Sequence, residues 1–124
     1  MSKNYYSLGL MSGTSMDGVD VSIIKSDGDI EFKGIFNKYF EYNDDFSKKF
    51  LKIRDKINNT KDLNLYSKEL NNIEKEITLF HAKVTNEAIK EANSNIDIIG
   101  FHGQTIFHSS KEKVSKQLGD GKLL

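Results

Sequence analysis

Two short segments of this 124-residue chain concentrate residues that could bind a ligand. The first is residues 12–18 (Ser-Gly-Thr-Ser-Met-Asp-Gly), where two glycines and three hydroxyl side chains lie between two apolar runs. Glycine lets backbone N–H groups approach an anion closely, and hydroxyl groups donate further hydrogen bonds, so this segment could cradle a phosphate. It has neither the Gly-Lys-Ser/Thr ending of a P-loop nor the G-x-G-x-x-G dinucleotide pattern. A plain hairpin turn rich in glycine and serine explains the same residues.

The second segment is residues 102–105 (His-Gly-Gln-Thr), which directly follows an apolar run at residues 96–101. Ligands of open α/β sheets bind just beyond the carboxyl ends of the strands, where this segment would lie. Gly103 permits close approach, while His102 and Gln104 can donate or accept hydrogen bonds. A strand-to-loop turn with one buried, hydrogen-bonded histidine accounts for the segment equally well.

Other residues with chemical potential fit structural roles better. His81 lies beside the apolar stripe of a predicted helix, so we expect it to be structural or solvated. The chain has no cysteine and no H-x-x-x-H spacing, which disfavours a zinc site, and no G-x-S-x-G elbow supports a hydrolase triad. The lysine-rich stretches at residues 48–52 and 111–116 are interrupted by acidic or apolar residues, as on solvated faces.

The composition is that of one small soluble domain, with 37% hydrophobic and 29% charged residues. Eighteen Lys and Arg balance eighteen Asp and Glu, so the net charge is zero. This balance argues against a nucleic-acid partner held by a basic face and against attraction to an anionic membrane. No stretch approaches the ~18 apolar residues of a membrane span, and the N-terminus lacks a signal-peptide pattern. We therefore expect a cytoplasmic protein.

Strands and a first helix must position these segments. Strands are expected at residues 5–11, 19–25 and 30–42, and the first two flank the glycine-bearing turn as a hairpin does. Asn43, followed by two aspartates, offers a helix N-cap and an acidic first turn. The apolar residues that follow are spaced as one helical stripe: Phe46, Phe50, Ile53 and Ile57.

A second stripe predicts one long amphipathic helix over residues 63–92. Its apolar members are Leu63, Tyr66, Leu70, Ile73, Ile77, Phe80 and Val84. Such spacing also occurs in coiled coils, but a single helix packed on a sheet explains it and is favoured. Residues 96–101 are then typical of a buried parallel strand. The tail holds an edge strand, and residues 122–124 resemble the first turn of another helix.

The resulting pattern is α/β, with three strands, helices and a further strand. A strand that returns after a helix usually lies parallel to an earlier strand, so we expect a mixed sheet. A parallel sheet needs helices on both faces, and the predicted helices suffice for one face. Residues 1–124 are therefore expected to be the opening of a larger α/β domain.

Three strings of residues resemble one known family. Residues 9–20 (Gly-Leu-Met-Ser-Gly-Thr-Ser-Met-Asp-Gly-Val-Asp) and 99–105 (Ile-Gly-Phe-His-Gly-Gln-Thr) closely resemble motifs of the anhydro-N-acetylmuramic acid kinases. Residues 117–121 (Gln-Leu-Gly-Asp-Gly) resemble the family's next short motif. The strings occur in the family's order and at compatible spacing, while residues 26–95 match only in pattern. This resemblance makes the phosphate cradle the preferred interpretation of the first segment.

The resemblance implies a fold and a reaction. Such kinases belong to the actin-like, hexokinase-like ATPase superfamily, so the implied fold is a mixed sheet of the ribonuclease H-like type. Residues 1–124 would be the N-terminal part of the first actin-like domain, with the remainder of the kinase absent. The implied reaction opens the 1,6-anhydro ring of anhydro-N-acetylmuramic acid with water. It uses ATP and Mg²⁺ to phosphorylate O6, giving N-acetylmuramic acid 6-phosphate and ADP in peptidoglycan recycling.

The resemblance also implies roles for particular residues. The ATP phosphates would bind at a hairpin formed by Gly13, Thr14, Ser15, Met16, Asp17, Gly18, Val19 and Asp20. The sugar would lie near His102, Gly103, Gln104 and Thr105. The aspartate that usually ends the first strand in this superfamily is replaced here by Met11-Ser12. Carboxylate assistance with magnesium would therefore come from Asp20 or Asp17.

The family's chains are much longer than this one. The family's catalytic base, an aspartate in a later basic and glycine-rich motif, has no counterpart before Leu124, and the adenosine-binding half also lies beyond it. We therefore expect no catalytic residue in this chain and no kinase activity from it alone. The alternative is a non-catalytic half-domain that binds a partner or self-associates through its unfinished sheet.

Overall fold

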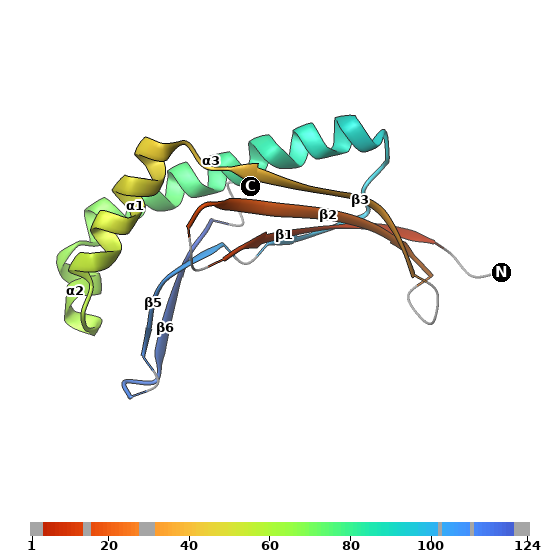
Figure 1. The fold of residues 1–124 in the computed structure, drawn as a ribbon. Coiled ribbons are helices and arrows are strands. Elements are labelled where there is room, and N and C mark those ends of the chain that lie inside the picture. The colour runs from red at the N-terminus through yellow and green to blue at the C-terminus, as the bar shows by residue number, and fades with distance from the viewer. Residues whose placement is uncertain (1–3, 14–15, 28–31, 102, 110, 121–124) are drawn as a thin grey trace.

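The computed structural model describes residues 4–13, 16–27, 32–101, 103–109 and 111–120. Its centre is a four-stranded sheet of order β3-β2-β1-β4 (Figure 1). The strands are β1 (Tyr5–Ser12), β2 (Gly18–Ser26), β3 (Phe32–Glu41) and β4 (Ile98–Phe101). The first three are antiparallel neighbours, and β4 runs parallel to β1. The predicted hairpin, third strand and parallel strand of a mixed α/β sheet are confirmed.

Alternating side chains give the sheet one apolar face. Leu8 and Leu10 of β1 and Val19, Val21 and Ile23 of β2 are all buried on the same side. Successive strand residues point to opposite faces, so this alternation fixes which side of the hairpin meets the helices.

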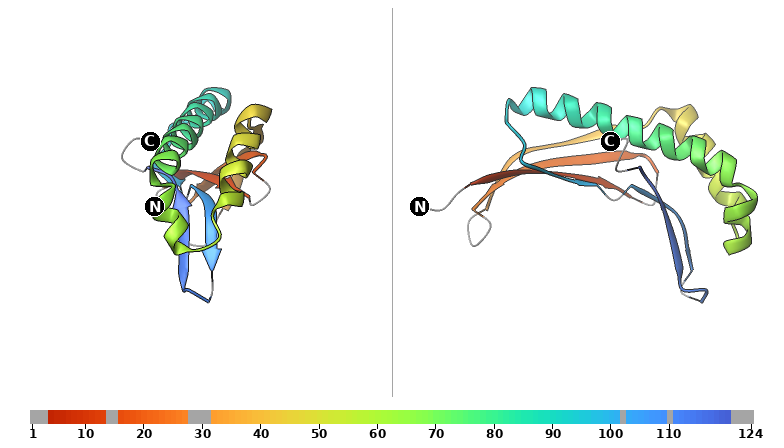
Figure 2. Two further views of the ribbon diagram at one scale, coloured as in Figure 1. Left: turned by 90° about the vertical axis from the view of Figure 1, so that its left-hand side faces the viewer. Right: turned by 180° about the vertical axis from the view of Figure 1, so that it is seen from behind.

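Three helices follow β3: α1 (Asp44–Lys56), α2 (Thr60–Leu65) and α3 (Ser67–Ala92). The predicted cap is confirmed, because Asn43 accepts a hydrogen bond from the Asp45 amide at 2.8 Å. The long helix α3 lies along the apolar face of the sheet, with α1 beside its N-terminal half (Figures 1 and 2). It is a helix packed on a sheet, as favoured over a coiled coil.

The prediction of one continuous helix over residues 63–92 is wrong. The chain turns at Tyr66, where ψ is 20° instead of the helical value, so α2 and α3 are separate. Asn59 caps the short α2 by accepting from the Asp62 amide at 3.1 Å. The turn lets Leu63 and Tyr66 pack against the α1–α3 core, which explains why both belong to the apolar spacing. The end of α3 is as predicted, with Asn93 left-handed at φ 50°.

The prediction that residues 96–101 form a buried strand is wrong in its burial. In β4, Ile98 is 58% exposed and Ile99 43% exposed. The strand lies at the edge of the sheet, and within the described ranges no strand pairs with its outer side. An apolar run of this kind is typical of a strand that is covered on both faces, and the described residues do not cover β4 on both faces.

The chain ends its described part in a second, two-stranded sheet. Strands β5 (Gln104–Ser109) and β6 (Val114–Leu118) pair antiparallel and project from the main sheet on the side opposite α3 (Figures 1 and 2). Ile106 and Leu118 at its base join a core with Phe50 of α1 and Ile77 of α3. This core fixes the hairpin next to the β1–β2 turn. The predicted helical turn at residues 122–124 falls outside the described residues.

The helices give no sign of a membrane span. In the described part of the chain, none combines the length and the apolar character that crossing a bilayer demands.

Candidate functional site

The two segments singled out in the sequence meet at the carboxyl end of β1. The Ser12 hydroxyl donates a hydrogen bond to the Gly103 carbonyl at 2.9 Å. In the opposite sense, the Gln104 side-chain amide donates to the Gly13 carbonyl at 2.8 Å. Residues 91 positions apart in the chain are thus joined by two reciprocal bonds. The predicted phosphate turn and the predicted sugar-side segment therefore lie side by side.

The described part of the third string, residues 117–120, reaches the same place. Gly103 has φ 77°, and a side chain there would overlap the carbonyl oxygen of Leu118. The segment after Leu118 is held by α3, because the Gly119 amide donates to Glu74 at 3.1 Å and the Asp120 amide to Thr78 at 2.9 Å. The described parts of all three strings therefore converge at one end of the sheet.

Tyr42 belongs to this site, although its sequence position gave no signal. Its ring is buried edge-on to Phe46 and Phe80, at 5.0 and 4.8 Å between ring centroids. Its hydroxyl donates to the Gln104 side-chain oxygen at 3.4 Å. Burial raises the pKa of Tyr42 to about 12, against a smaller lowering by a hydrogen bond with Ser12. The phenol is therefore neutral at physiological pH.

His81 packs beneath the two segments. Its ring is fully buried and lies edge-on to Phe101 at 5.0 Å. Nδ1 lies 2.8 Å from the Ile77 carbonyl, which can only accept, so Nδ1 carries a hydrogen. Nε2 lies 3.4 Å from the Ser12 hydroxyl. The expectation of a structural histidine is confirmed, and its spacing of four from Ile77 could have placed it on the buried face.

Of the residues predicted to bind ATP, two have buried side chains with packing roles. Met16, at φ 60°, is 1% exposed in the α1–α3 core, and Val19 is 0% exposed in the core of the sheet. Their side chains are therefore not available to bind a phosphate. Met16 is anchored at both ends, because its amide donates to Gly13 at 3.3 Å and its carbonyl accepts from Ser47. Thr14, Ser15 and His102 lie outside the described residues.

The two predicted magnesium carboxylates face different hollows. Asp17 lines a cavity of about 290 Å³ with Glu41 and Asp44. Asp20 lines one of about 440 Å³ with Met11, on the sheet face opposite α3. The pKa of Tyr39, a half-exposed residue, is raised by partial desolvation and then by the charges of Asp17, Glu41 and Asp20. The electrostatic potential beside the turn is therefore negative.

A direct metal site is not assembled by these carboxylates. The described ranges contain no group of three or more His, Asp or Glu side chains that could hold a metal. Magnesium prefers octahedral oxygen ligands, keeps several waters and commonly shares substrate phosphates. These two carboxylates would therefore reach a magnesium ion only through its waters.

The comparisons with known proteins decide the family. Residues 5–124 match the family model described as anhydro-N-acetylmuramic acid kinase. The chain belongs to the anhydro-N-acetylmuramic acid kinase family. The resemblance drawn from the three strings is thereby confirmed.

Curated members of the kinase family align along nearly the whole chain. An anhydro-N-acetylmuramic acid kinase of Pelagibacter ubique is 60% identical over 124 residues, which are 100% of this chain and 33% of the relative. One of Rhizobium etli is 36% identical, and one of Brucella canis 35% identical; each alignment covers 94% of this chain and 32% of the relative. The chain spans about a third of the length of these relatives.

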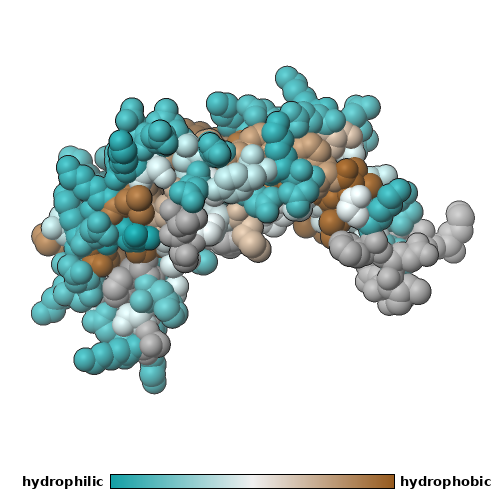
Figure 3. Space-filling view, in the orientation of Figure 1, coloured by the Kyte–Doolittle hydropathy of each residue, from teal (hydrophilic) through white to brown (hydrophobic). Residues whose placement is uncertain are grey.

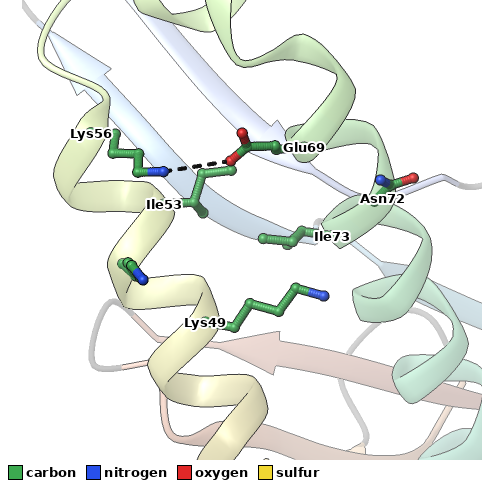
Figure 4. A pocket seen from close by; sticks show the side chains of 7 residues that line it. Lys49, Ile53, Lys56, Glu69, Asn72 and Ile73 are labelled. Carbon is green, nitrogen blue, oxygen red and sulfur yellow. Dashed lines mark ion pairs between the residues drawn. The ribbon is translucent and has the colours of Figure 1, made fainter.

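A further pocket of this kinase-family chain lies away from the three strings, between α1 and α3 (Figure 4). Its floor is Ile53 and Ile73, and lysines of α1 rim it. Lys56 pairs with Glu69 at 3.8 Å, and the neighbouring Lys49 pairs with Glu76 at 3.1 Å. These exposed pairs and the apolar floor describe a groove where two helices pack, in agreement with the solvated lysine face expected from the sequence.

Proposed function

We propose that residues 13–20 bind the phosphates of ATP in a kinase acting on 1,6-anhydro-N-acetylmuramic acid. The reaction consumes ATP and water and yields N-acetylmuramic acid 6-phosphate and ADP. The family match supports the reaction. The observation that carries the site is the hydrogen bond from Gln104 to the Gly13 carbonyl, which brings two of the family-like strings into one place.

In this proposal, the backbone of the β1–β2 turn is the phosphate ligand. Gly13 is exposed, so its surroundings leave room for an anion, whereas the side chains of Met16 and Val19 are buried. Backbone N–H groups in such a turn form an anion-binding concavity. The segment 102–105 borders the turn and would line the side of the cleft that faces the sugar.

Magnesium would accompany the nucleotide, with Asp20 and Asp17 holding its waters. Both carboxylates are exposed beside the turn, and the acidic surroundings would repel a bare triphosphate. When bound, the ion would neutralise phosphate charge. We also propose that the protein works in the cytoplasm, where ATP is available. The balanced charge favours neither a nucleic-acid nor a membrane partner.

Turnover is proposed to need the part of the kinase that this chain does not match. Two thirds of the length of the Pelagibacter ubique relative has no counterpart in these 124 residues. Water attack on the anhydro carbon needs a positioned base, and kinases of this kind close two domains around their substrates. We expect residues 1–124 alone to transfer no phosphate.

The test joins residues 1–124 to the remaining two thirds of the Pelagibacter ubique relative. We expect the chimera to phosphorylate 1,6-anhydro-N-acetylmuramic acid with ATP, and purified residues 1–124 to fail. Gly13→Val should lower kcat/KM roughly 100-fold, the scale of losing one backbone donor to a developing charge, with little change in melting temperature. Asp20→Asn should lose activity most strongly at low magnesium.

Gly34→Val is the matched control, because a Cβ at Gly34 has no neighbour within 4 Å. It should leave kcat/KM unchanged. A folded Gly13→Val chimera with near-normal turnover and ATP affinity would remove the turn from the active site. Phosphorylation by residues 1–124 alone, free of contaminating kinase, would refute the need for the remainder.

A second candidate function is an interaction module that binds a second copy of itself. The observation that favours it is the exposure of Met11, Tyr39 and Ile98 on the sheet face opposite α3. Unpaired strand edges and uncovered apolar faces promote association.

A further inference from the structure

Gln104 is buried at the centre of the site. Its side chain is 1% exposed, and it lies at the first position of β5. The Gly13 carbonyl can only accept a hydrogen bond, so the side-chain atom 2.8 Å from it must be the amide nitrogen. The side-chain oxygen then faces the Tyr42 hydroxyl, which donates to it at 3.4 Å. The Gly13 carbonyl thus fixes which way round the amide lies, and the Tyr42 hydroxyl supports that orientation.

The Gly13 carbonyl is held from two sides. It accepts from Gln104 and also from the Met16 amide at 3.3 Å. Both donors lie in the protein interior, because both residues are 1% exposed. The carbonyl, which carries partial negative charge, is therefore directed away from solvent.

This orientation matters for an anion. A carbonyl held inward keeps its partial negative charge away from the outer side of the turn. An outward carbonyl would instead repel a phosphate. A second hydrogen bond joins the same two segments, because the hydroxyl of Ser12, at the end of β1, donates to the Gly103 carbonyl at 2.9 Å.

We infer that Gln104 is a positioning residue of the phosphate turn: it holds the Gly13 carbonyl inward and acts on nucleotide binding, not as a ligand of the sugar. The inference rests on the proposed function for its catalytic consequence. Its structural part concerns the turn alone. Both polar ends of the Gln104 amide are engaged by protein groups, which supports positioning over sugar binding.

The first test measures amide hydrogen exchange in the 124-residue chain without any ligand. Gln104→Met keeps the length of the side chain and removes the donor. It should speed exchange at the Met16 amide, which donates to the Gly13 carbonyl, roughly tenfold, the scale expected from one lost hydrogen bond. Val84→Ala, a buried change on α3, controls for general loss of stability. A Met16 amide that exchanges no faster in Gln104→Met than in Val84→Ala would overturn the inference.

The second test uses the chimeric kinase described above. Gln104→Met should raise the KM for ATP or lower kcat while leaving the KM for the anhydro sugar unchanged. Tyr42→Phe should change the same parameter in the same direction by a smaller factor, because it removes one hydrogen bond to the Gln104 side-chain oxygen and keeps the bond to Gly13. A rise in the sugar KM alone would overturn the inference and make Gln104 a sugar ligand.

The two tests separate this inference from the proposed function. An unmodified chimera that folds but phosphorylates nothing would refute the proposed function. Hydrogen exchange at the turn would then decide the structural part of the inference by itself.

Discussion

Tyr42 shows how one buried polar group links separate parts of the chain. It follows β3, its amide donates to the Asp17 carbonyl at 2.7 Å, and its hydroxyl reaches Gln104. Its ring is 6% exposed and lies against Phe46 and Phe80. A phenol buried among aromatic rings is stable only while it is neutral, because burial penalises the phenolate.

The raised pKa of Tyr42 predicts a loss of stability in alkali. The folded pKa is about 12, against 10 for an unperturbed tyrosine, so the folded state holds the proton more tightly. The contribution of the protonated Tyr42 to the free energy of unfolding is therefore intact below pH 10. It is lost as the pH rises from 10 through 12, and the loss is on the order of 3 kcal/mol. Tyr42→Phe should flatten the fall of unfolding free energy in this range.

Urea unfolding of both proteins between pH 8 and pH 12 measures this difference. The values at pH 8 provide the reference, because there the Tyr42 hydroxyl is protonated in both the folded and the unfolded state. At that pH the Tyr42→Phe variant differs only by the loss of the hydroxyl's hydrogen bond. Other tyrosines and the lysines titrate in both proteins and cancel in the comparison. Parallel curves for the two proteins would show that Tyr42 ionises as freely when folded as when unfolded.

At the scale of elements, the turn between β1 and β2 depends on close contact with β3. Gly18 starts β2 opposite Glu41, and a Cβ there would overlap the Phe40 carbonyl oxygen. The neighbouring backbone cannot move without disturbing the β2–β3 hydrogen bonds. Glycine at this position is explained by strand packing, whatever the turn binds.

This contact predicts opposite outcomes for two glycines. Gly18→Ala should destabilise the 124-residue chain by about 1–3 kcal/mol, as overpacking does. Gly9→Ala, in the middle of β1, should be neutral or stabilising, because its Cβ would have no neighbour within 4 Å and alanine restricts the unfolded chain. Urea unfolding of the two variants checks the pair. Equal stabilities would contradict the close approach of β2 and β3.

At the scale of the whole molecule, the protein is an arch. The space-filling view shows it hollowed beneath the sheet, between the β5–β6 hairpin and the far end of the strands (Figure 3). On this uncovered side, Met11 is 66% exposed and Ile98 58% exposed. Helix α3 covers only the opposite face.

The uncovered face predicts self-association of residues 1–124. Sedimentation velocity over a wide concentration range should show an average mass that rises with concentration. Ile98→Lys should shift the chain to monomer, since a lysine on an edge strand blocks pairing with another copy. Leu79→Lys, on the exposed side of α3, is the matched control and should associate like the parent. A strictly monomeric parent with a sharp, cooperative melt would contradict the prediction.

Local patterns in the sequence were enough to predict most of the elements. The alternation in residues 19–25 gave a half-buried strand, Asn43 gave a helix cap, and Asn93 lies where the long helix was expected to end. The break at Tyr66 was missed, because apolar spacing of three and four continues through it on both helices. The exposure of Ile98 was missed because an apolar run shows what a strand can bury, not which elements cover it.

By itself, the sequence determined the family, the mixed α/β sheet and the two segments of the candidate site, because periodicity, caps and glycine-rich strings are local along the chain. Only the tertiary structure decided that the segments form one site, joined by Ser12, Gln104 and Tyr42. Those bonds link residues 62 and 91 positions apart. The packing of β1, β5 and the end of β3 determines which of these residues become hydrogen-bond partners. The spacing of residues within one segment does not predict it.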